Sequence, residues 1–162
     1  MNEKLRLLIE KLREVREEYG KFLQKPATKE DVERLNNAVK EKFKIELSPV
    51  YQSILLKTNG FNENGVFFYG TETALLQGYS DRYLGGLIET NETWYESYDS
   101  FTNHLFYADS DLYLFGQSLE SKLFTCYTRE SFGENLIFET NNDNEFFEKI
   151  FRLAVDDDFS IE

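Results

Sequence analysis

The sequence LSPVYQSILLKTNGFNENGVFFYG, residues 47–70, contains the start and end signals of one helix and one strand. Ser48-Pro49 suits a helix start, because serine caps the free N–H groups and proline fixes φ where no N–H is needed. Apolar residues then recur at helical spacing, and Asn59-Gly60 is typical of the left-handed turn after a helix. Turn-forming residues precede the β-branched and aromatic run at 66–69. The stretch therefore predicts a short helix, a turn and a strand.

Two further amphipathic helices are predicted on the amino-terminal side. Residues 2–24 carry an apolar stripe, which predicts a long helix that ends near Gly20 to Gln24 and is broken by Lys25-Pro26. Thr28 and Asp31 have the spacing of a capping box, which predicts a second helix to about Phe43. We expect both apolar faces to be buried in this chain's own core; the alternative for the first helix is that it extends toward a partner chain. The first face holds Leu5, Leu8, Ile9, Leu12, Val15, Tyr19, Phe22 and Leu23, and the second holds Val32, Leu35, Val39 and Phe43.

Residues 71–101 carry weaker signals. Residues 73–77 are interpreted as a short helical turn, and glycines at 78, 85 and 86 interrupt the chain. Residues 87–98 are interpreted as a helix, in which Trp94 and Tyr98 lie one turn apart on one face.

From His104 the apolar period changes toward two, which predicts strands. The strand-like segments are 105–108, 112–115, 123–127 and 136–138, and turn-forming residues at 109–111, 117–121 and 129–135 join them into an antiparallel meander. A last helical stripe at 146–154 is expected to cover one face of the sheet.

These elements predict an α+β fold: a single domain with a mostly antiparallel sheet flanked by helices from both ends of the chain. A chain of this length buries roughly 70% of its unfolded surface, which suits one domain with one core. We assign residues 1–27 to an amino-terminal helix that packs on the domain, residues 28–155 to the α+β domain itself, and residues 156–162 to an acidic tail.

The order of these elements resembles the SUKH superfamily. The resemblance covers roughly residues 28–155, and its motifs describe a helix-to-strand junction without a chemistry. SUKH proteins are mainly immunity proteins that bind and neutralise bacterial toxins, with some regulatory and scaffolding members. The family's Trp at the start of its first helix is absent here, which leaves the subfamily open. The matching residues are 32–35, Leu47-Ser48-Pro49, Tyr51, Ile54-Leu55, Asn59-Gly60, 66–70, 105–115 and 144–150.

Composition narrows the classes of partner. The net charge of −12 disfavours nucleic acid and anionic membranes, which are bound through Lys and Arg, and it suits a basic protein partner or simple solubility. No signal-peptide pattern or long apolar run is present, so we expect a cytoplasmic protein. The oligomeric state is left open.

Catalytic motifs are weak, so we expect no enzyme activity, no cofactor and no metal. His104 and Cys126 have no motif-supported catalytic partner, and Cys126 is expected to be a buried, inert side chain. Asp81, Asp99, Asp109 and Asp111 could pair as carboxylates or hold a cation, but aspartates at i and i+2 are more often turn formers. No glycine-rich phosphate loop is present.

With catalytic and metal sites disfavoured, the remaining function that the sequence suggests is binding of another protein through a surface. We expect the partner to bind a face that combines carboxylates with aromatic rings; the residues assigned to it are Asp81, Tyr83, Trp94, Tyr98, Asp109 and Asp111. The tyrosines of the strands either extend this face or line the core. The predicted function is an immunity protein that binds a basic toxin domain, for instance a nuclease. The alternatives are a hydrolase using Asp or Glu in a cleft beside Trp94, and a regulatory scaffold.

Overall fold

The computed structural model describes residues 1–131 and 134–162, which form a single α+β domain. Its helices are α1 (Glu3–Glu18), α2 (Lys29–Phe43), α3 (Pro49–Leu55), α4 (Leu87–Ser97), the 3-10 helix η1 (Asp99–Asn103) and α5 (Asp143–Val155). Its strands are β1 (Phe61–Glu63), β2 (Val66–Phe68), β3 (Ala74–Leu75), β4 (Tyr83–Leu84), β5 (His104–Asp109), β6 (Tyr113–Ser118), β7 (Phe124–Thr128) and β8 (Leu136–Thr140). The predicted fold class is confirmed.

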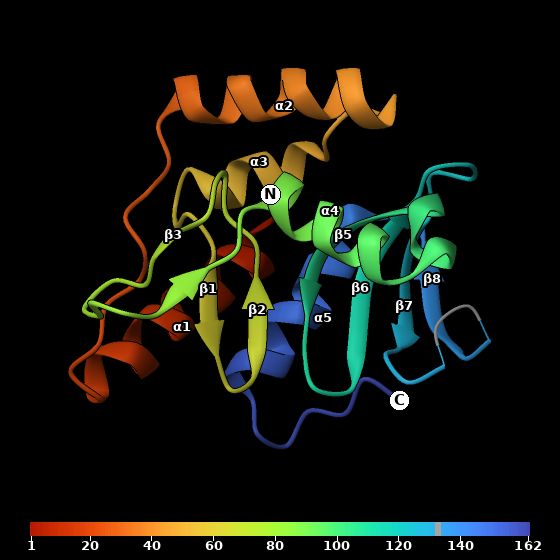
Figure 1. Ribbon diagram of the computed structural model, residues 1–162. Helices are drawn as coiled ribbons and strands as arrows, with labels where there is room; N and C mark the ends of the chain where they lie inside the picture. Colours follow the sequence, from red (N-terminus) through yellow and green to blue (C-terminus); the bar gives the residue numbers. More distant parts are fainter. Residues whose placement is uncertain (132–133) are drawn as a thin grey trace.

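One six-stranded sheet has the order β1-β2-β5-β6-β7-β8, with every neighbouring pair antiparallel (Figure 1). Strands β5 to β8 are the predicted meander, since each pairs with the next along the chain. Strands β3 and β4 form a separate two-stranded ribbon beside the β1 end of the sheet. The turn predicted at 129–135 includes residues 132 and 133, which lie outside the described part of the chain.

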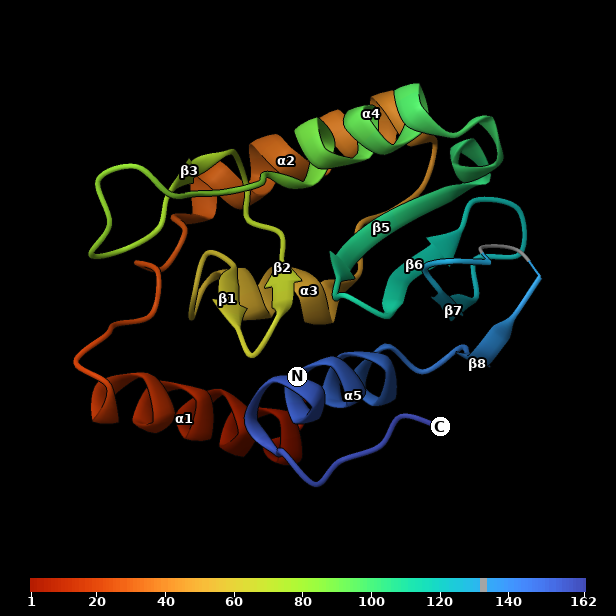
Figure 2. The same cartoon turned by 60° about the horizontal axis from the view of Figure 1, so that its bottom comes forward.

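Helices cover both faces of the sheet. Helices α1 and α5 lie side by side on one face, whereas α4 and the β3–β4 ribbon lie on the other, and α2 runs beyond the ends of the strands (Figures 1 and 2). Helix α5 therefore covers one face of the sheet, as its apolar stripe predicts. Buried Asn91 fixes α4 to the other face, because its side chain donates to the Phe106 carbonyl (2.9 Å) and accepts from the Phe106 N–H (2.7 Å).

An aromatic cluster fills the space between the sheet and α5. The Phe147 ring lies 5.9 Å from Phe68, 5.4 Å from Tyr107 and 4.9 Å from Phe146, measured between ring centroids. The strand tyrosines lie more in the interior than on the surface, with Tyr107 in this cluster and Tyr69 on the opposite face, where its hydroxyl accepts from Trp94 of α4. Tyr69, Tyr107 and Tyr113 are buried and Tyr127 is half-buried.

Two predicted helix starts are confirmed. The Ser48 hydroxyl accepts from the Tyr51 N–H with Pro49 at the first helical position, and Thr28 and Asp31 form a reciprocal capping box. The end of α3 differs, because the helix stops at Leu55 and Gly60 lies beyond it. With a φ of +83°, Gly60 turns the chain into β1, where a Cβ would stand 2.5 Å from the Phe68 carbonyl oxygen.

Three local predictions were wrong. Helix α1 ends at Glu18, because Gly20 adopts φ +68° and closes the helix, so Tyr19 and Phe22 are 73% and 60% exposed. Residues 73–77 contain strand β3 and no helical turn, since the chain pairs with β4. The stretch 61–68 is a hairpin about Asn64-Gly65, both at positive φ, a signal that the sequence carried in its Asn-Gly pair.

Residues 156–162 fold back onto the domain. The Arg152 guanidinium lies 4.1 Å from the Phe159 ring centroid, Ile161 is buried, and the Tyr113 hydroxyl donates to Glu162 Oε2 at 2.8 Å. Within the described residues, no helix combines the length and apolar character needed to cross a membrane.

Candidate functional site

Charge is divided unevenly along the chain. Residues 1–82 contain 14 basic and 13 acidic side chains, whereas residues 83–162 contain four basic and 17 acidic side chains, a net charge of −13. The negative charge of the protein therefore belongs to its carboxyl half, which includes α4, β5 to β8 and α5. A cationic partner is attracted most strongly to surfaces built from this half.

A pocket of about 410 Å³ opens in the acidic half, between α4, η1 and the segment after β7. We call it the Trp94 pocket. Trp94 is half-buried, Tyr98 is 54% exposed, and Phe101 is buried beneath them with its ring centroid 4.7 Å from that of Tyr98 and 5.6 Å from that of Trp94. The rings thus form a rigid apolar wall beside carboxylates. The lining consists of Trp94, Tyr98, Ser100, Phe101, Arg129, Glu130, Ser131 and Glu134.

A polar network holds Trp94 from below. The indole N–H donates to the Tyr69 hydroxyl at 3.1 Å, and that hydroxyl donates to Asp109 Oδ2 at 2.5 Å. Arg129 completes the network, with its Nη1 3.4 Å from Asp109 Oδ1 and 2.8 Å from the Ser110 carbonyl oxygen. Its guanidinium carbon lies 5.1 Å from the centroid of the Trp94 ring. One tryptophan face therefore already contacts a cation.

Burial raises the pKa of Asp109 above its ordinary value, because the desolvated carboxylate is less stable than the neutral acid. The Tyr69 hydrogen bond and the Arg129 charge lower the pKa and only partly offset burial, while Asp111 raises it. Burial also raises the pKa of Tyr69, and the neighbouring Asp109 charge adds to this effect. Asp109 thus has both oxygens engaged and positions Tyr69 and Arg129.

Asp109→Asn should remove a loss of folding stability that the Asp109 side chain causes in the wild-type protein as pH rises. A raised folded-state pKa means that Asp109 favours the folded state below pH 3.8 and that this contribution is lost as pH rises through the folded-state pKa. Asparagine does not ionise, so the stability of the variant relative to wild type should increase from pH 4 to pH 7. Denaturant unfolding of both proteins across this range measures the difference. A constant difference would contradict the raised pKa.

The structure brings together only part of the predicted binding face. Trp94 and Tyr98 line one pocket. Asp109 is only 9% exposed and lies beneath that pocket. The prediction that Asp109 contacts the partner is therefore corrected: Asp109 positions Tyr69 and Arg129. Asp111 is exposed at the β5–β6 turn and lines a different pocket of about 390 Å³, beside Gly65 and Leu112. Asp111 adjoins the polar network beneath Trp94 only along the chain, because it follows Asp109 and Ser110.

Asp81 and Tyr83 belong elsewhere. Both are exposed on the β3–β4 ribbon, which lies at the β1 end of the molecule in Figures 1 and 2, whereas the Trp94 pocket adjoins β7 at the other end. Residues 81–83 are close to Trp94 in sequence but do not share a surface with it, because the ribbon lies at the opposite end of the sheet from the pocket.

Sequence reasoning missed Phe101, Tyr69, Arg129, Glu130 and Glu134. One signal was available for Phe101, which follows Trp94 and Tyr98 in an aromatic series with short spacing. The other four come from distant segments, so only the fold brings them to Trp94.

Cys126 and His104, considered above as nucleophile and base, each lie in a buried or half-buried environment. Cys126 is fully buried, which raises the pKa of its thiol and suppresses the thiolate. His104 packs its ring between Phe106 and Tyr127, and burial lowers its pKa. Over residues 1–131 and 134–162, His, Cys, Asp and Glu form no group of three or more suited to a metal ion.

Comparison with protein-family models, with curated proteins and with solved structures finds no match for this chain. The resemblance to SUKH proteins stays a prediction from the residues quoted above.

Proposed function

We propose that the chain is a non-catalytic protein-binding module, an immunity protein that binds and neutralises a basic toxin domain. One observation carries the proposal: a half-open aromatic pocket with carboxylates at its rim lies in the half of the chain that has a net charge of −13. Aromatic anchors with a charged rim are typical of protein-binding sites. The resemblance of residues 28–155 to SUKH proteins supports the same class of function.

Binding would use the pocket as a receptor for a cationic side chain. Tyr98 offers an exposed ring for a cation–π contact, and Glu130 and Glu134 offer carboxylates at the mouth. Arg129 already lies over Trp94, so an incoming arginine or lysine would compete with it for the tryptophan face. The body of the domain would then block the active-site cleft of the toxin. The negative charge of the carboxyl half would raise the association rate with the basic toxin.

The hydrolase alternative has one observation in its favour, the raised pKa of Asp109 beneath the Trp94 pocket. Against it, both Asp109 oxygens are engaged, one by Tyr69 and one by Arg129, and Asp109 does not line the pocket. A general acid or base must reach substrate directly or through one water. Binding therefore accounts for the geometry better than hydrolysis does.

The test is association with a basic toxin domain, and the proposal expects that domain to be encoded by the gene directly upstream. Glu130→Lys with Glu134→Lys should slow association at low salt by about tenfold, because it inverts the charge that steers the encounter. Tyr98→Ala should instead speed dissociation by about tenfold through loss of an aromatic anchor. Surface plasmon resonance measures both rates.

Glu10→Lys with Glu14→Lys is the matched control, because it makes the same charge change on exposed positions of α1. It should alter the association rate much less. Unchanged kinetics in both the Glu130/Glu134 and the Tyr98 variants would exclude the Trp94 pocket as the interface. Substrate turnover that is lost in Asp109→Asn while the fold is retained would favour the hydrolase.

A further inference from the structure

A second surface of opposite charge lies where the end of α1, residues 21–26 and the β3–β4 ribbon meet. Two pockets open there, of about 320 and 140 Å³. We call their combined lining the basic flank. Its charged side chains are the basic Arg13, Arg16, Lys21, Lys25, Lys57 and Arg82 and the acidic Glu17 and Glu63. In a protein of net charge −12, six basic against two acidic side chains is a local reversal of charge.

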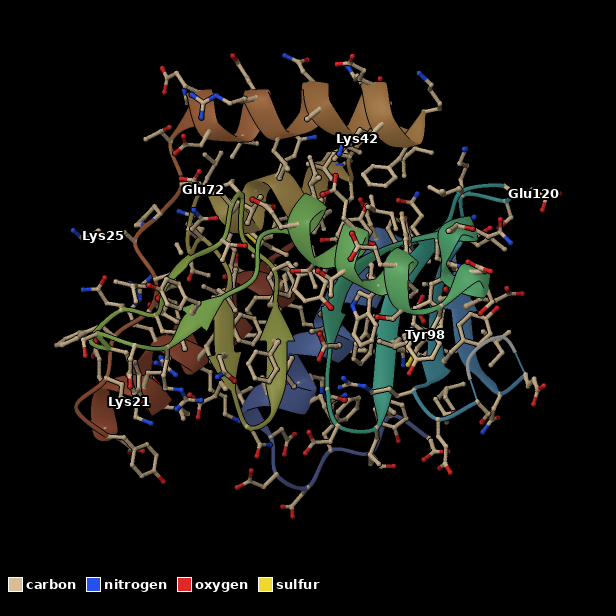
Figure 3. All side chains as sticks on the ribbon, in the orientation of Figure 1. Lys21, Lys25, Lys42, Glu72, Tyr98 and Glu120 are labelled. Atoms are coloured by element: carbon tan, nitrogen blue, oxygen red, sulfur yellow. The ribbon has the colours of Figure 1, made fainter. Side chains whose placement is uncertain are left out.

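Figure 3 shows Lys21 and Lys25 on one side of the molecule, and Tyr98 of the Trp94 pocket toward the other. Of the six basic side chains, Arg16 is neutralised by Glu63, with 2.7 Å between Arg16 Nη1 and Glu63 Oε2. Arg13 forms a weaker pair, with 3.7 Å between its Nε and Glu10 Oε2, and its side chain is 39% exposed. Lys21, Lys25 and Lys57 are exposed, so the flank keeps positive charge that a ligand can reach.

Apolar side chains are exposed beside these cations. Phe22 is 60% exposed in the larger pocket. Leu75 and Tyr83 are directly opposite each other on the outward face of the ribbon, and both are exposed. Isolated exposed apolar residues are ordinary, but this cross-strand pair lies beside the segment that carries Phe22 and enlarges the exposed apolar surface there.

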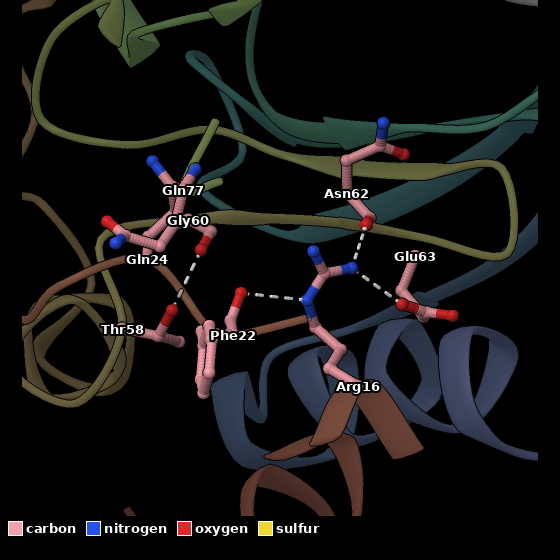
Figure 4. A network of polar contacts seen from close by, with 8 residues as sticks. All are labelled: Arg16, Phe22, Gln24, Thr58, Gly60, Asn62, Glu63 and Gln77. Carbon is pink, nitrogen blue, oxygen red and sulfur yellow. Dashed lines mark hydrogen bonds and ion pairs between the residues drawn. The ribbon is translucent and has the colours of Figure 1, made fainter. Parts of the chain in front are cut away.

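The flank is also held in place. Gln24 accepts from the Gln77 N–H at 2.5 Å and donates to the Leu75 carbonyl at 3.0 Å, which ties residues 21–26 to the ribbon. Arg16 ties the same segment to β1, because it donates to the carbonyls of Phe22 and Asn62 (Figure 4). A surface that is ordered before binding loses little entropy when a ligand docks.

We propose that the basic flank docks a segment of a partner protein that combines carboxylates with an aromatic or aliphatic side chain. The carboxylates pair with Arg13, Lys25 and Lys57, and the apolar side chain packs on Phe22 and the Leu75–Tyr83 pair. A polynucleotide is disfavoured because its many phosphates extend beyond the flank toward the acidic remainder of the protein. The flank is independent of the Trp94 pocket, so the chain can hold two partners of opposite charge.

The test is a titration of the isotope-labelled full chain with the peptide acetyl-Asp-Glu-Phe-Asp-Leu-Glu-amide, followed by NMR. Amide shifts are expected at residues 13–26, 57 and 74–83, with saturation below about 1 mM peptide. Lys25→Glu with Lys57→Glu should weaken binding about tenfold, and added salt should weaken it as well. Lys4→Glu with Lys40→Glu makes the same charge change at exposed positions elsewhere and should leave the affinity unchanged.

Two control ligands define specificity. The peptide with Lys in place of Asp and Glu should not shift the flank, and the peptide with Ala in place of Phe and Leu should bind more weakly. Flank shifts that are absent at 1 mM, or that persist at equal affinity in Lys25→Glu with Lys57→Glu, would overturn the proposal. Tighter binding of single-stranded DNA than of the peptide would also overturn it. The dissociation rate of a toxin bound at the Trp94 pocket should not respond to these variants, so the two proposals fail separately.

Discussion

Replacing Phe147 by alanine is expected to lower the free energy of unfolding by about 3–5 kcal/mol. Phe147 is fully buried, and its ring packs on rings from α3, β2, β5, β7 and α5. Few side chains can move to fill the space, because each neighbouring ring is itself held by others. The contacting rings are those of Tyr51, Phe68, Tyr107, Phe124 and Phe146.

Urea unfolding at constant m-value measures the change. Phe22→Ala is the matched control, since Phe22 is exposed on the basic flank, and its expected change is within about 0.5 kcal/mol. A loss below about 1.5 kcal/mol for Phe147→Ala would mean that the aromatic cluster between the sheet and α5 repacks around the cavity.

Arg16→Met is expected to destabilise the fold by about 3–5 kcal/mol, although methionine fills much of the same space. Arg16 is 5% exposed and bonds to Glu63, to the Asn62 carbonyl and to the Phe22 carbonyl at 2.7, 2.8 and 3.0 Å (Figure 4). Methionine would leave a poorly solvated carboxylate and two carbonyls without their donor. The same side chain covers the outer edge of β1, an edge strand of the sheet.

A double-mutant cycle with Glu63→Gln separates the ion pair from the two carbonyl bonds, because only the ion-pair part should couple. Arg13→Met is the control, with an expected loss below about 1 kcal/mol for a half-exposed side chain one turn away. If Arg16→Met were as stable as the control, the edge of β1 would be held by packing alone, and the polar network of Figure 4 would be incidental to stability.

The two candidate surfaces differ in how they relate to this core. Trp94 rests on a buried network that ends in Asp109, so changes to Tyr69 or Asp109 should alter the Trp94 pocket without touching its rim. The basic flank rests on Arg16 and Gln24, which lie at the junction of α1, β1 and β3. Variants at Tyr98, Lys25 and Lys57 avoid both supports, which is why they serve as the binding probes.

The sequence alone determined the elements whose signals are local. The Ser48-Pro49 start, the capping box of Thr28 and Asp31, and the alternation in residues 104–140 each depend on neighbours within a few residues. Such signals survive in any tertiary context, because they arise from backbone hydrogen bonding and side-chain period. They were enough to predict the α+β class, the meander and the covering helix α5.

Only the tertiary structure decided which polar and aromatic side chains are buried and which meet. Asp109 carries the same local pattern as exposed Asp111, yet it is buried because Tyr69 and Arg129, 40 and 20 residues away, engage its oxygens. Arg16 lies on an apolar helix face, and Glu63 and Asn62, more than 40 residues away, make its burial possible. A charge is buried only where a partner compensates its desolvation, and that partner is supplied by the fold.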